Sequence, residues 1–395
     1  MKKFFPIIFV ILTVSLLLSA CGVEQLSFTC SDPLGCVTIE PGSSIKVGTL
    51  LTMSGPDSPY GIDALRGVEI AVAHKGKLLE HDIELVKVDD QCSADGGQQG
   101  ATDLAKNSQI VGVIGATCSN ASTPAAKILS DAGMVMISPS STAPSLTGQT
   151  THRAGFLRTI YNDKVQGNVV ADFAFHGLGA RTMVTIHDGG AYSLELQQAA
   201  CDVFQQLGGE CLKQIQIESG QDVTTTIQEI ALLNPSVLYY PVYTTDGVAI
   251  TKAVKESQMV NTALISSDGL LSSDFLAQTE PGSENMYLSG PATLSDDTAF
   301  MQEYKSTYGE NPVASYHAQA YDAAEMLFKA IEEVAVKESD GTVHIPRQAL
   351  RSALFNIKDM QGLSGTLSCS ILGDCAIPNI LIYQVRNQEF VPVYP

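Results

Sequence analysis

The chain has 395 residues and contains no tryptophan, few cations and none of the short motifs that mark common enzyme sites. Its 23 lysines and arginines stand against 42 aspartates and glutamates, which gives a net charge of −19 at pH 7. This balance argues against nucleic acid as a partner, because nucleic acids bind basic surfaces. We find no phosphate-loop, dinucleotide-binding, zinc-protease or serine-hydrolase motif, so the sequence predicts neither an enzyme nor a cofactor.

The nine cysteines lack the spacing of a metal site, because no Cys-x-x-Cys is present and none stands at zinc-ligand spacing from a histidine. We therefore expect no metal. Apart from Cys21, an even number remains, which favours disulfides in an exported protein. Pairing neighbours along the chain gives a proposal among many possible connectivities: Cys30 with Cys36, Cys92 with Cys118, Cys201 with Cys211, and Cys369 with Cys375.

The N-terminus has the features of an export signal. Lys2 and Lys3 precede an apolar run over residues 4–18, and the sequence Leu18-Ser-Ala-Cys21 resembles the bacterial lipobox. This resemblance implies that residues 1–20 are removed and that Cys21 becomes lipidated and anchors the protein to a membrane. An uncleaved membrane helix is the alternative, but the run is short for a span of about 20 residues. Residues 21–44 show no periodicity and are interpreted as a tether.

From residue 45 onward, apolar strand patterns alternate with amphipathic helix patterns. This alternation predicts an α/β fold with doubly wound parallel sheets and right-handed crossovers. The expected strands are 45–51, 83–88, 110–114, 134–137, 182–187, 212–217, 237–240 and 262–266, and the expected helices are 61–73, 97–107, 123–131, 164–175, 192–207, 223–233 and 247–257.

The pattern runs too long for one compact sheet, so we expect two lobes. Helices expected at 298–308, 315–336 and 346–356 have no strand partners and should pack on an earlier lobe. Two short strands, 365–368 and 380–385, close the chain. The chain would then cross between the lobes more than once and form a hinge beside a cleft. Lobe 1 is expected to comprise 45–160 and about 291–362, and lobe 2 to comprise 161–290 and about 363–395.

Two consecutive strands end in stretches rich in hydroxyl groups. The strand 110–114 runs into Gly115-Ala-Thr-Cys-Ser119, and the strand 134–137 runs into Ser138-Pro-Ser-Ser-Thr142. Pro124 is expected near the start of the helix that follows the first stretch. If the strands are parallel neighbours, both stretches lie at the edge where open α/β sheets bind ligands. A helix N-terminus flanked by hydroxyl groups can bind a carboxylate or phosphate; alternatively, these residues only mark surface turns.

The order and spacing of several short segments resemble one protein family from residue 45 to the C-terminus. These segments are Met53-Ser-Gly-Pro56 with Tyr60-Gly61, Lys87-Val-Asp-Asp90 with Cys92, Ile114-Gly-Ala-Thr-Cys-Ser119, Ser138 to Pro144, Leu157-Arg-Thr159 with Gln166-Gly167, His187-Asp188 with Tyr192, and Tyr239-Tyr240 with Tyr243. The chain resembles the substrate-binding proteins of branched-chain amino-acid ABC transporters, the Leu/Ile/Val-binding group. The resemblance implies the type I periplasmic-binding fold, in which two lobes joined by a multi-strand hinge enclose the ligand cleft.

The resemblance also assigns roles to residues. Ser119 and Thr142 would hold the α-carboxylate of an amino-acid ligand, and the carbonyl of Ser140 would accept from its α-amino group. Asp268 would pair with the α-ammonium. The aromatic residues expected to line the cleft are Tyr60, Tyr192 and Tyr243, and Cys92 and Cys118 match a disulfide of the family.

These assignments have alternatives. The best-known amino-acid binders carry glutamate where Asp268 stands, so the shorter side chain could reach an ammonium through a water, or the ligand could lack an α-amino group. Asp268 could also be a turn residue before Gly269, and Tyr192 and Tyr243 could belong to the core. His187 next to Asp188 suggests acid–base chemistry, but a histidine at the end of a buried strand is more often structural.

The resulting expectation is a monomeric, exported solute-binding lipoprotein. It would capture a small zwitterion by hinge closure and deliver it to an inner-membrane ABC permease with its ATPase. It would lie on the periplasmic face in a Gram-negative cell, or otherwise on the outer surface of the cytoplasmic membrane. The alternatives are a sensor of the same fold coupled to a membrane receptor or kinase, and a family member that binds an amide, urea or an aromatic acid.

Overall fold

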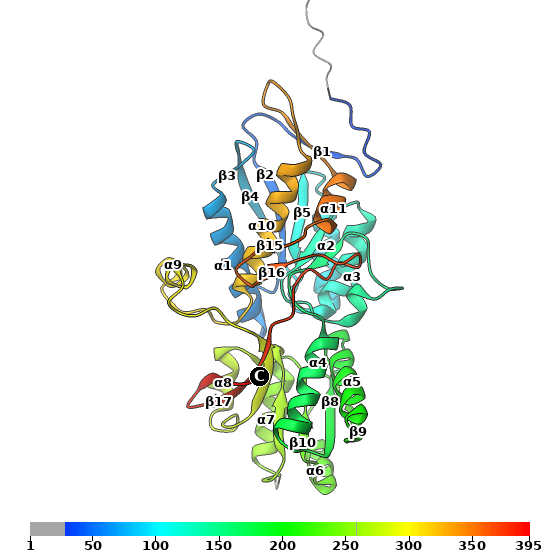
Figure 1. Cartoon of the computed structure of the whole chain (residues 1–395), viewed down its shortest axis with the longest axis vertical. Coiled ribbons are helices and arrows are strands. Elements are labelled where there is room, and N and C mark those ends of the chain that lie inside the picture. The colour runs from blue at the N-terminus through cyan, green and yellow to red at the C-terminus, as the bar shows by residue number, and fades with distance from the viewer. Residues whose placement is uncertain (1–27, 258) are drawn as a thin grey trace, which may run out of the picture.

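The computed structural model describes residues 28–257 and 259–395 and has two lobes stacked along the long axis of the molecule (Figure 1). Lobe 1, the upper half in Figure 1, is built on a six-stranded sheet, and lobe 2, the lower half, on a seven-stranded sheet. The expected α/β fold with two parallel-sheet lobes is confirmed.

Lobe 1 has the strand order β3-β4-β2-β5-β6-β7. All neighbours are parallel except β3 and β4. The central strand β5 is buried along its whole length, as a strand covered on both faces must be. The strand bounds are β2 Ile45–Leu51, β3 Lys77–Leu78, β4 His81–Asp89, β5 Ile110–Gly115, β6 Met136–Ser138 and β7 Phe156–Arg158.

Helices cover both faces of this sheet. One face packs against α1 and α10, and the other against α2 and α3. Helices α1 and α10 approach closely because Gly67 has no side chain; a Cβ there would lie 2.1 Å from the carbonyl oxygen of His317. The helix bounds are α1 Ser58–Lys75, α2 Ala94–Ala105, α3 Ser119–Asp131, α9 Ala299–Tyr308, α10 His317–Val334 and α11 Arg347–Phe355. The late helices thus pack on lobe 1, as expected.

Lobe 2 has the strand order β18-β17-β12-β11-β10-β8-β9, in which β17 and β18 are antiparallel to the parallel remainder. The strands are β8 Thr182–His187, β9 Glu210–Gln216, β10 Val237–Tyr239, β11 Ala263–Ser266, β12 Tyr287–Pro291, β17 Ile380–Arg386 and β18 Glu389–Tyr394. The helices are α4 Asp163–Asp172, α5 Ala191–Gln206, α6 Thr224–Leu233, α7 Thr244–Lys255 and α8 Ser273–Thr279.

The chain passes between the lobes after β7, after β12 and after the short hairpin of β15 Met360–Gln361 and β16 Thr366–Leu367 (Figure 1). Arg158, at the end of β7, ties two of these crossings together. Its Nε donates to Asp374 Oδ1 at 2.6 Å, and its Nη1 donates to the carbonyls of Ser141 and Ala143. Its Nη2 donates to Thr147 Oγ1 at 2.6 Å. The guanidinium is fully buried, so the hinge contains a charged network that is saturated with hydrogen bonds.

The segment interpreted as a tether is partly folded. Residues Cys36–Ile39 form strand β1, which pairs antiparallel with β14 (Val343–Pro346), and β14 also pairs with β13 (Val336–Lys337). The carboxylate of Asp32 accepts hydrogen bonds from two backbone N–H groups at the start of α11. The strand was missed because only Val37 and Ile39 alternate inward, and two apolar residues carry too little periodicity.

Two other sequence-based expectations concern the ends of elements. Helix α3 begins at Ser119 and includes Pro124, which therefore does not open the helix as expected. The proposed signal peptide and the lipidation site Cys21 lie outside the described residues. Within residues 28–257 and 259–395, no helix combines the length and apolar character needed to cross a membrane.

The proposed cysteine pairing is confirmed. Disulfides join Cys30 to Cys36, Cys92 to Cys118, Cys201 to Cys211, and Cys369 to Cys375.

Candidate functional site

A small cavity lies between the lobes and brings together five of the predicted ligand-binding residues: Tyr60, Ser140, Tyr192, Tyr243 and Asp268. Thr117, Cys118, Gly269 and Tyr316 complete the lining. The space measures about 260 Å³, but the centre of a water molecule can occupy only about 10 Å³ of it. The side chains therefore almost fill the site, and the structure is a closed form of the cleft.

Asp268 lies at the centre of this cavity on the lobe 2 side. It begins the short turn η3 (Asp268–Leu270) that follows β11, and it is 2% exposed. Its Oδ1 accepts hydrogen bonds from Gln166 Nε2 at 2.9 Å and from the Tyr192 hydroxyl at 2.7 Å. Its Oδ2 accepts from the Tyr316 hydroxyl at 2.8 Å. Burial raises the pKa of Asp268, and these three donors oppose that rise.

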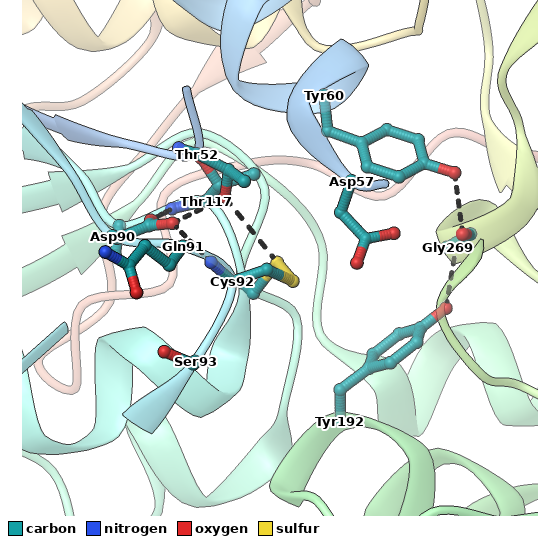
Figure 2. Close-up of a disulfide and its surroundings, with 12 residues drawn as sticks. Thr52, Asp57, Tyr60, Asp90, Gln91, Cys92, Ser93, Thr117, Tyr192 and Gly269 are labelled. Atoms are coloured by element: carbon teal, nitrogen blue, oxygen red, sulfur yellow. Dashed lines mark hydrogen bonds between the residues drawn. A yellow bond between two sulfur atoms is a disulfide. The ribbon is translucent and has the colours of Figure 1, made fainter. Parts of the chain in front are cut away.

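The two lobes meet at Gly269. The hydroxyl of Tyr60, from α1 of lobe 1, donates to the carbonyl of Gly269 at 2.6 Å, and the N–H of Gly269 donates to the Tyr192 hydroxyl at 3.0 Å (Figure 2). A Cβ at Gly269 would lie 2.8 Å from the carbonyl oxygen of Val242, so only glycine fits. Together with the bond from Tyr316 to Asp268, this contact joins the closed lobes through phenol hydroxyls.

Two more hydrogen bonds join the lobes at the mouth of the cleft. The N–H of Thr244 in lobe 2 donates to Asp57 Oδ1 at 3.1 Å, and the N–H of Ser145 in lobe 1 donates to Glu195 Oε2 at 2.8 Å. Burial raises the pKa of Asp57, while the hydrogen bonds from Thr244 lower it. In Figure 2 the Asp57 carboxylate lies between the disulfide loop and Tyr192.

Ser119, Ser140 and Thr142, the predicted carboxylate and amine partners, follow β5 and β6 in lobe 1. Ser140 lines the cavity, whereas Ser119 and Thr142 do not. Ser119 is the first residue of α3, and its hydroxyl accepts from the N–H of Ala143 at 3.2 Å. The Ser140 hydroxyl donates to the carbonyl of Thr117 at 2.7 Å. Thr142 is fully buried, and its hydroxyl has no hydrogen-bond partner among the described residues. The start of α3 and an unpaired hydroxyl can therefore receive an anion.

A buried aspartate braces this side of the cavity. Asp90 accepts hydrogen bonds from the Thr52 hydroxyl and the N–H of Cys92 through Oδ1, and from the N–H of Thr117 through Oδ2 (Figure 2). Burial raises the pKa of Asp90 to about 6, although these donors lower it. The carboxylate and the disulfide from Cys92 to Cys118 thus hold the loop after β4 against the start of α3.

Two tyrosine rings form the opposite wall. The rings of Tyr192 and Tyr243 lie 5.0 Å apart at 30°. Burial raises the pKa of Tyr243, the charges of Asp188, Asp57 and Asp268 raise it further, and the backbone N–H of Ser119 opposes them. The Tyr243 hydroxyl thus lies near the start of α3 in this closed form.

Sequence reasoning missed Tyr316 and Asp163. Tyr316 directly precedes α10. An aromatic residue near the expected start of a helix does not by itself indicate that it lines the cleft. Asp163 is fully buried in the first turn of α4, and neither of its oxygens has a hydrogen-bond partner in the part of the chain that the structure describes. By contrast, His187 is 7% exposed and its Nδ1 accepts from the N–H of Gly189, as a structural histidine would.

Two α/β lobes that are joined by several crossings and enclose a shared cavity define a solute-binding protein with its site between the lobes. The model of the periplasmic binding protein family matches residues 44–387, which is most of the chain. The chain belongs to this family, whose members bind solutes outside the cytoplasm.

Curated and solved relatives agree with this assignment. The chain is 23% identical to the Leu/Ile/Val-binding protein homolog 3 of Brucella melitensis, over 88% of the chain and 93% of that protein. A leucine-binding protein from Thermotoga maritima superposes with a TM-score of 0.79 at 23% identity, covering 88% of the chain and 97% of that structure. A solute-binding protein from R. palustris in complex with benzoate gives a TM-score of 0.75 at 21% identity, covering 89% and 96%. At these identities the likeness shows the fold.

Proposed function

We propose that the protein captures a small zwitterion, most simply a branched-chain or other amino acid, and delivers it to an ABC permease with its ATPase. The observation that carries the proposal is that groups able to bind an anion lie in lobe 1, whereas a carboxylate able to bind a cation lies in lobe 2. Lobe 1 presents the start of α3 and the hydroxyls of Ser119 and Thr142, whereas lobe 2 presents the buried carboxylate of Asp268. A zwitterion needs this pairing, because each of its charges must meet an opposite charge or a hydrogen-bonding partner.

Binding would begin on lobe 1. The ligand carboxylate would accept hydrogen bonds from the first turn of α3 and from the unpaired hydroxyl of Thr142. The apolar side chain of the ligand would contact the rings of Tyr192 and Tyr243, which bury apolar surface at little entropic cost. The names of the Brucella and Thermotoga relatives support an amino acid as the ligand.

Closure would then place lobe 2 over the ligand. The closed arrangement already has bonds from Tyr60 to Gly269 and from Tyr316 to Asp268, and the ligand adds contacts that only this arrangement can make. A ligand shifts such an equilibrium only by its differential affinity for the closed form. The permease would recognise the closed shape, and the lipid on Cys21 would keep the monomer at the membrane. No covalent step is involved in this cycle, and we propose no enzymatic activity.

One observation favours a second candidate ligand. Asp268 already accepts three hydrogen bonds, which leaves little capacity for an ammonium. A carboxylic acid without an amino group would need only the lobe 1 partners, and the R. palustris neighbour is bound to benzoate. The shared chemistry of both candidates is a carboxylate, and the amino group distinguishes them.

Calorimetric titration of the chain with the twenty amino acids, 4-methylpentanoate and benzoate tests the proposal. We expect an amino acid to bind most tightly, and Thr142→Ala and Asp268→Ala each to weaken binding about tenfold or more, because a hydrogen bond to a charged group contributes ~1.5–3 kcal/mol. Thr102→Ala, on the exposed face of α2, serves as the control. If Thr142→Ala and Asp268→Ala both bind as tightly as the wild type, the site assignment is wrong. If only 4-methylpentanoate or benzoate binds, the ligand is not a zwitterion.

A further inference from the structure

The carboxylate expected to receive the ammonium is already satisfied by the protein. Asp268 accepts from Gln166, Tyr192 and Tyr316 at 2.7–2.9 Å. Two of these donors, Gln166 and Tyr192, belong to lobe 2 itself and would hold the carboxylate whether the cleft is open or closed. An ammonium that approached Asp268 would have to displace a phenol or share an oxygen with it.

A second buried carboxylate, that of Asp163, lies close enough to Asp268 for the two charges to interact. Asp163 is fully buried, and neither oxygen has a donor within the described residues. Gln166, three residues later on the same face of α4, turns its Nε2 toward Asp268 and leaves its own Oε1 without a partner. Thr142 is adjacent, since its carbonyl accepts from the N–H of Asp163 at 3.0 Å, and its hydroxyl is also unpaired. Three acceptor atoms and one hydroxyl without hydrogen-bond partners thus lie on neighbouring residues.

Within the described residues, no cation donates a hydrogen bond to Asp163. Arg158 is the basic side chain that lowers the pKa of Asp163, but four of its five N–H groups donate to Asp374, Thr147 and two backbone carbonyls. The Thr142 hydroxyl also lowers the pKa of Asp163. The remaining groups whose charges act on Asp163, or on which its charge acts, are acidic or phenolic: Asp268 of η3, Glu195 and Tyr192 of α5, Tyr239 of β10, and Tyr161 in the loop before α4. Buried polar atoms are normally paired, so this group of unpaired atoms indicates a missing donor.

We propose that Asp163 is the principal anionic partner of the ligand's ammonium group, and that Asp268 mainly positions the phenols of the cleft. The inference rests on the proposed function, because it places the charged amine of that ligand. An ammonium supplies three N–H donors, and Asp163 with the Oε1 of Gln166 supplies three vacant acceptors. The required ligand class is therefore a primary amine that carries a carboxylate at short distance.

This arrangement links binding to a proton. Burial and the neighbouring charge of Asp268 raise the pKa of Asp163 well above its usual value, so the ligand-free protein keeps a proton there to a higher pH than an exposed aspartate does. An ammonium can pair only with the ionised carboxylate, so the proton on Asp163 leaves to buffer as the ligand enters. Affinity should accordingly rise as the pH rises, until Asp163 is ionised in the free protein.

The test compares wild type, Asp163→Asn and Asp202→Asn, a control that removes an exposed charge from α5 in the same lobe. Three probes are titrated calorimetrically at pH 7 into the full chain, in two buffers of different ionisation enthalpy: L-leucine, 3-methylbutylamine and 4-methylpentanoate. We expect L-leucine to release a fraction of a proton, up to about one, from the wild type and the control. Asp163→Asn should bind L-leucine about tenfold or more weakly, without proton release, and its affinity for 4-methylpentanoate should not change.

Each outcome decides between the two proposals. If L-leucine binds Asp163→Asn as tightly as the wild type, a buried water satisfies Asp163 and the inference is overturned while the function stands. If 3-methylbutylamine binds the wild type but not the variant, and no amino acid binds, the inference stands and the function fails. If neither 3-methylbutylamine nor any of the twenty amino acids binds, both fail. Should Asp163→Asn not fold, the affinity of the wild type for L-leucine is measured from pH 4 to pH 8, and an affinity that does not rise over this range overturns the inference.

Discussion

At the residue scale, buried aspartates organise the cleft, and each has a different set of partners. Asp90 accepts three hydrogen bonds and braces the loop after β4, whereas Asp268 accepts three and positions phenols. Asp163 accepts none within the described chain. Burial raises the pKa of all three, and the hydrogen bonds decide how far. Asp90 and Asp268, whose oxygens accept hydrogen bonds from the protein, stabilise the structure of the cleft. Asp163, whose oxygens accept none, has the capacity to bind a ligand.

The pKa of Asp90 predicts a pH dependence of stability. Folding raises it from 3.8 to about 6, so between these values the folded protein binds more protons than the unfolded chain. Stability from this group is therefore full below about pH 4 and falls as the pH rises through about 6, by about 3 kcal/mol at 1.36 kcal/mol per pKa unit. Asp90→Asn lacks this dependence.

Urea unfolding of the wild type and Asp90→Asn at pH 4 and pH 7 measures the effect. We expect the stability of the wild type relative to the variant to be greater at pH 4 than at pH 7. Asp103→Asn is the control with the opposite sign, because Lys106 lowers the pKa of Asp103 and the wild type should gain on this variant as the pH rises. Parallel pH profiles for wild type and Asp90→Asn would contradict the role given to Asp90.

At the scale of elements, the disulfides divide into one at the site and others remote from it. The bond from Cys92 to Cys118 joins the loop after β4 to the residue before α3, and Cys118 lines the cavity. The bond from Cys201 to Cys211 joins α5 to β9 on the far side of lobe 2. Both close loops of modest length, with sequence separations of 26 and 10.

Replacing each pair by serine should separate stability from binding. The loop-entropy relation gives each bond about 3 kcal/mol, so both double variants should unfold at lower urea concentrations by similar amounts. Only Cys92→Ser with Cys118→Ser should also weaken ligand binding, because it frees the start of α3. Urea unfolding and calorimetric titration measure the two effects. Equal loss of affinity in both variants would show that the disulfide at the cleft has no special role.

At the scale of the whole molecule, the closed form is held by hydrogen bonds that reach across the cleft. Tyr60 and Tyr316 of lobe 1 donate to Gly269 and Asp268 of lobe 2. A net hydrogen bond contributes ~0.5–1.5 kcal/mol, and one to a charged group ~1.5–3 kcal/mol. Together the two phenols should favour the closed form by about 2–4 kcal/mol, which is roughly a 30- to 1,000-fold shift in population.

Small-angle X-ray scattering can measure this shift. Without ligand, the double variant Tyr60→Phe, Tyr316→Phe should have a larger radius of gyration than the wild type, and saturating ligand should reduce it. Tyr240→Phe is the matched control, because its hydroxyl contacts Thr251 within lobe 2 at 3.0 Å and does not cross the cleft. A radius of gyration equal to that of the wild type would mean that the phenols do not hold the lobes together.

Features that depend on local patterns could be predicted from the amino-acid sequence alone. Strand β2 at 45–51 and strand β8 at 182–187 match their expected bounds, because both are rich in apolar and β-branched residues and are flanked by turn residues. The cysteines pair with their neighbours in the chain, where loop closure is easiest. Strand β12 was missed because its Ser-Gly-Pro ending has the composition of a turn.

Which side chains meet in the cleft depends on contacts between distant parts of the chain. Tyr316 and Asp268 are 48 residues apart in the chain, and their contact exists because the chain crosses back to lobe 1 between them. Whether the oxygens of Asp163 or those of Asp268 lack hydrogen bonds depends on the donors that folding brings near each carboxylate. The periodicity of apolar residues in the sequence does not show where those donors will lie. Local patterns fix elements because neighbouring residues interact in every conformation, whereas long-range polar contacts exist only once the lobes have formed and closed.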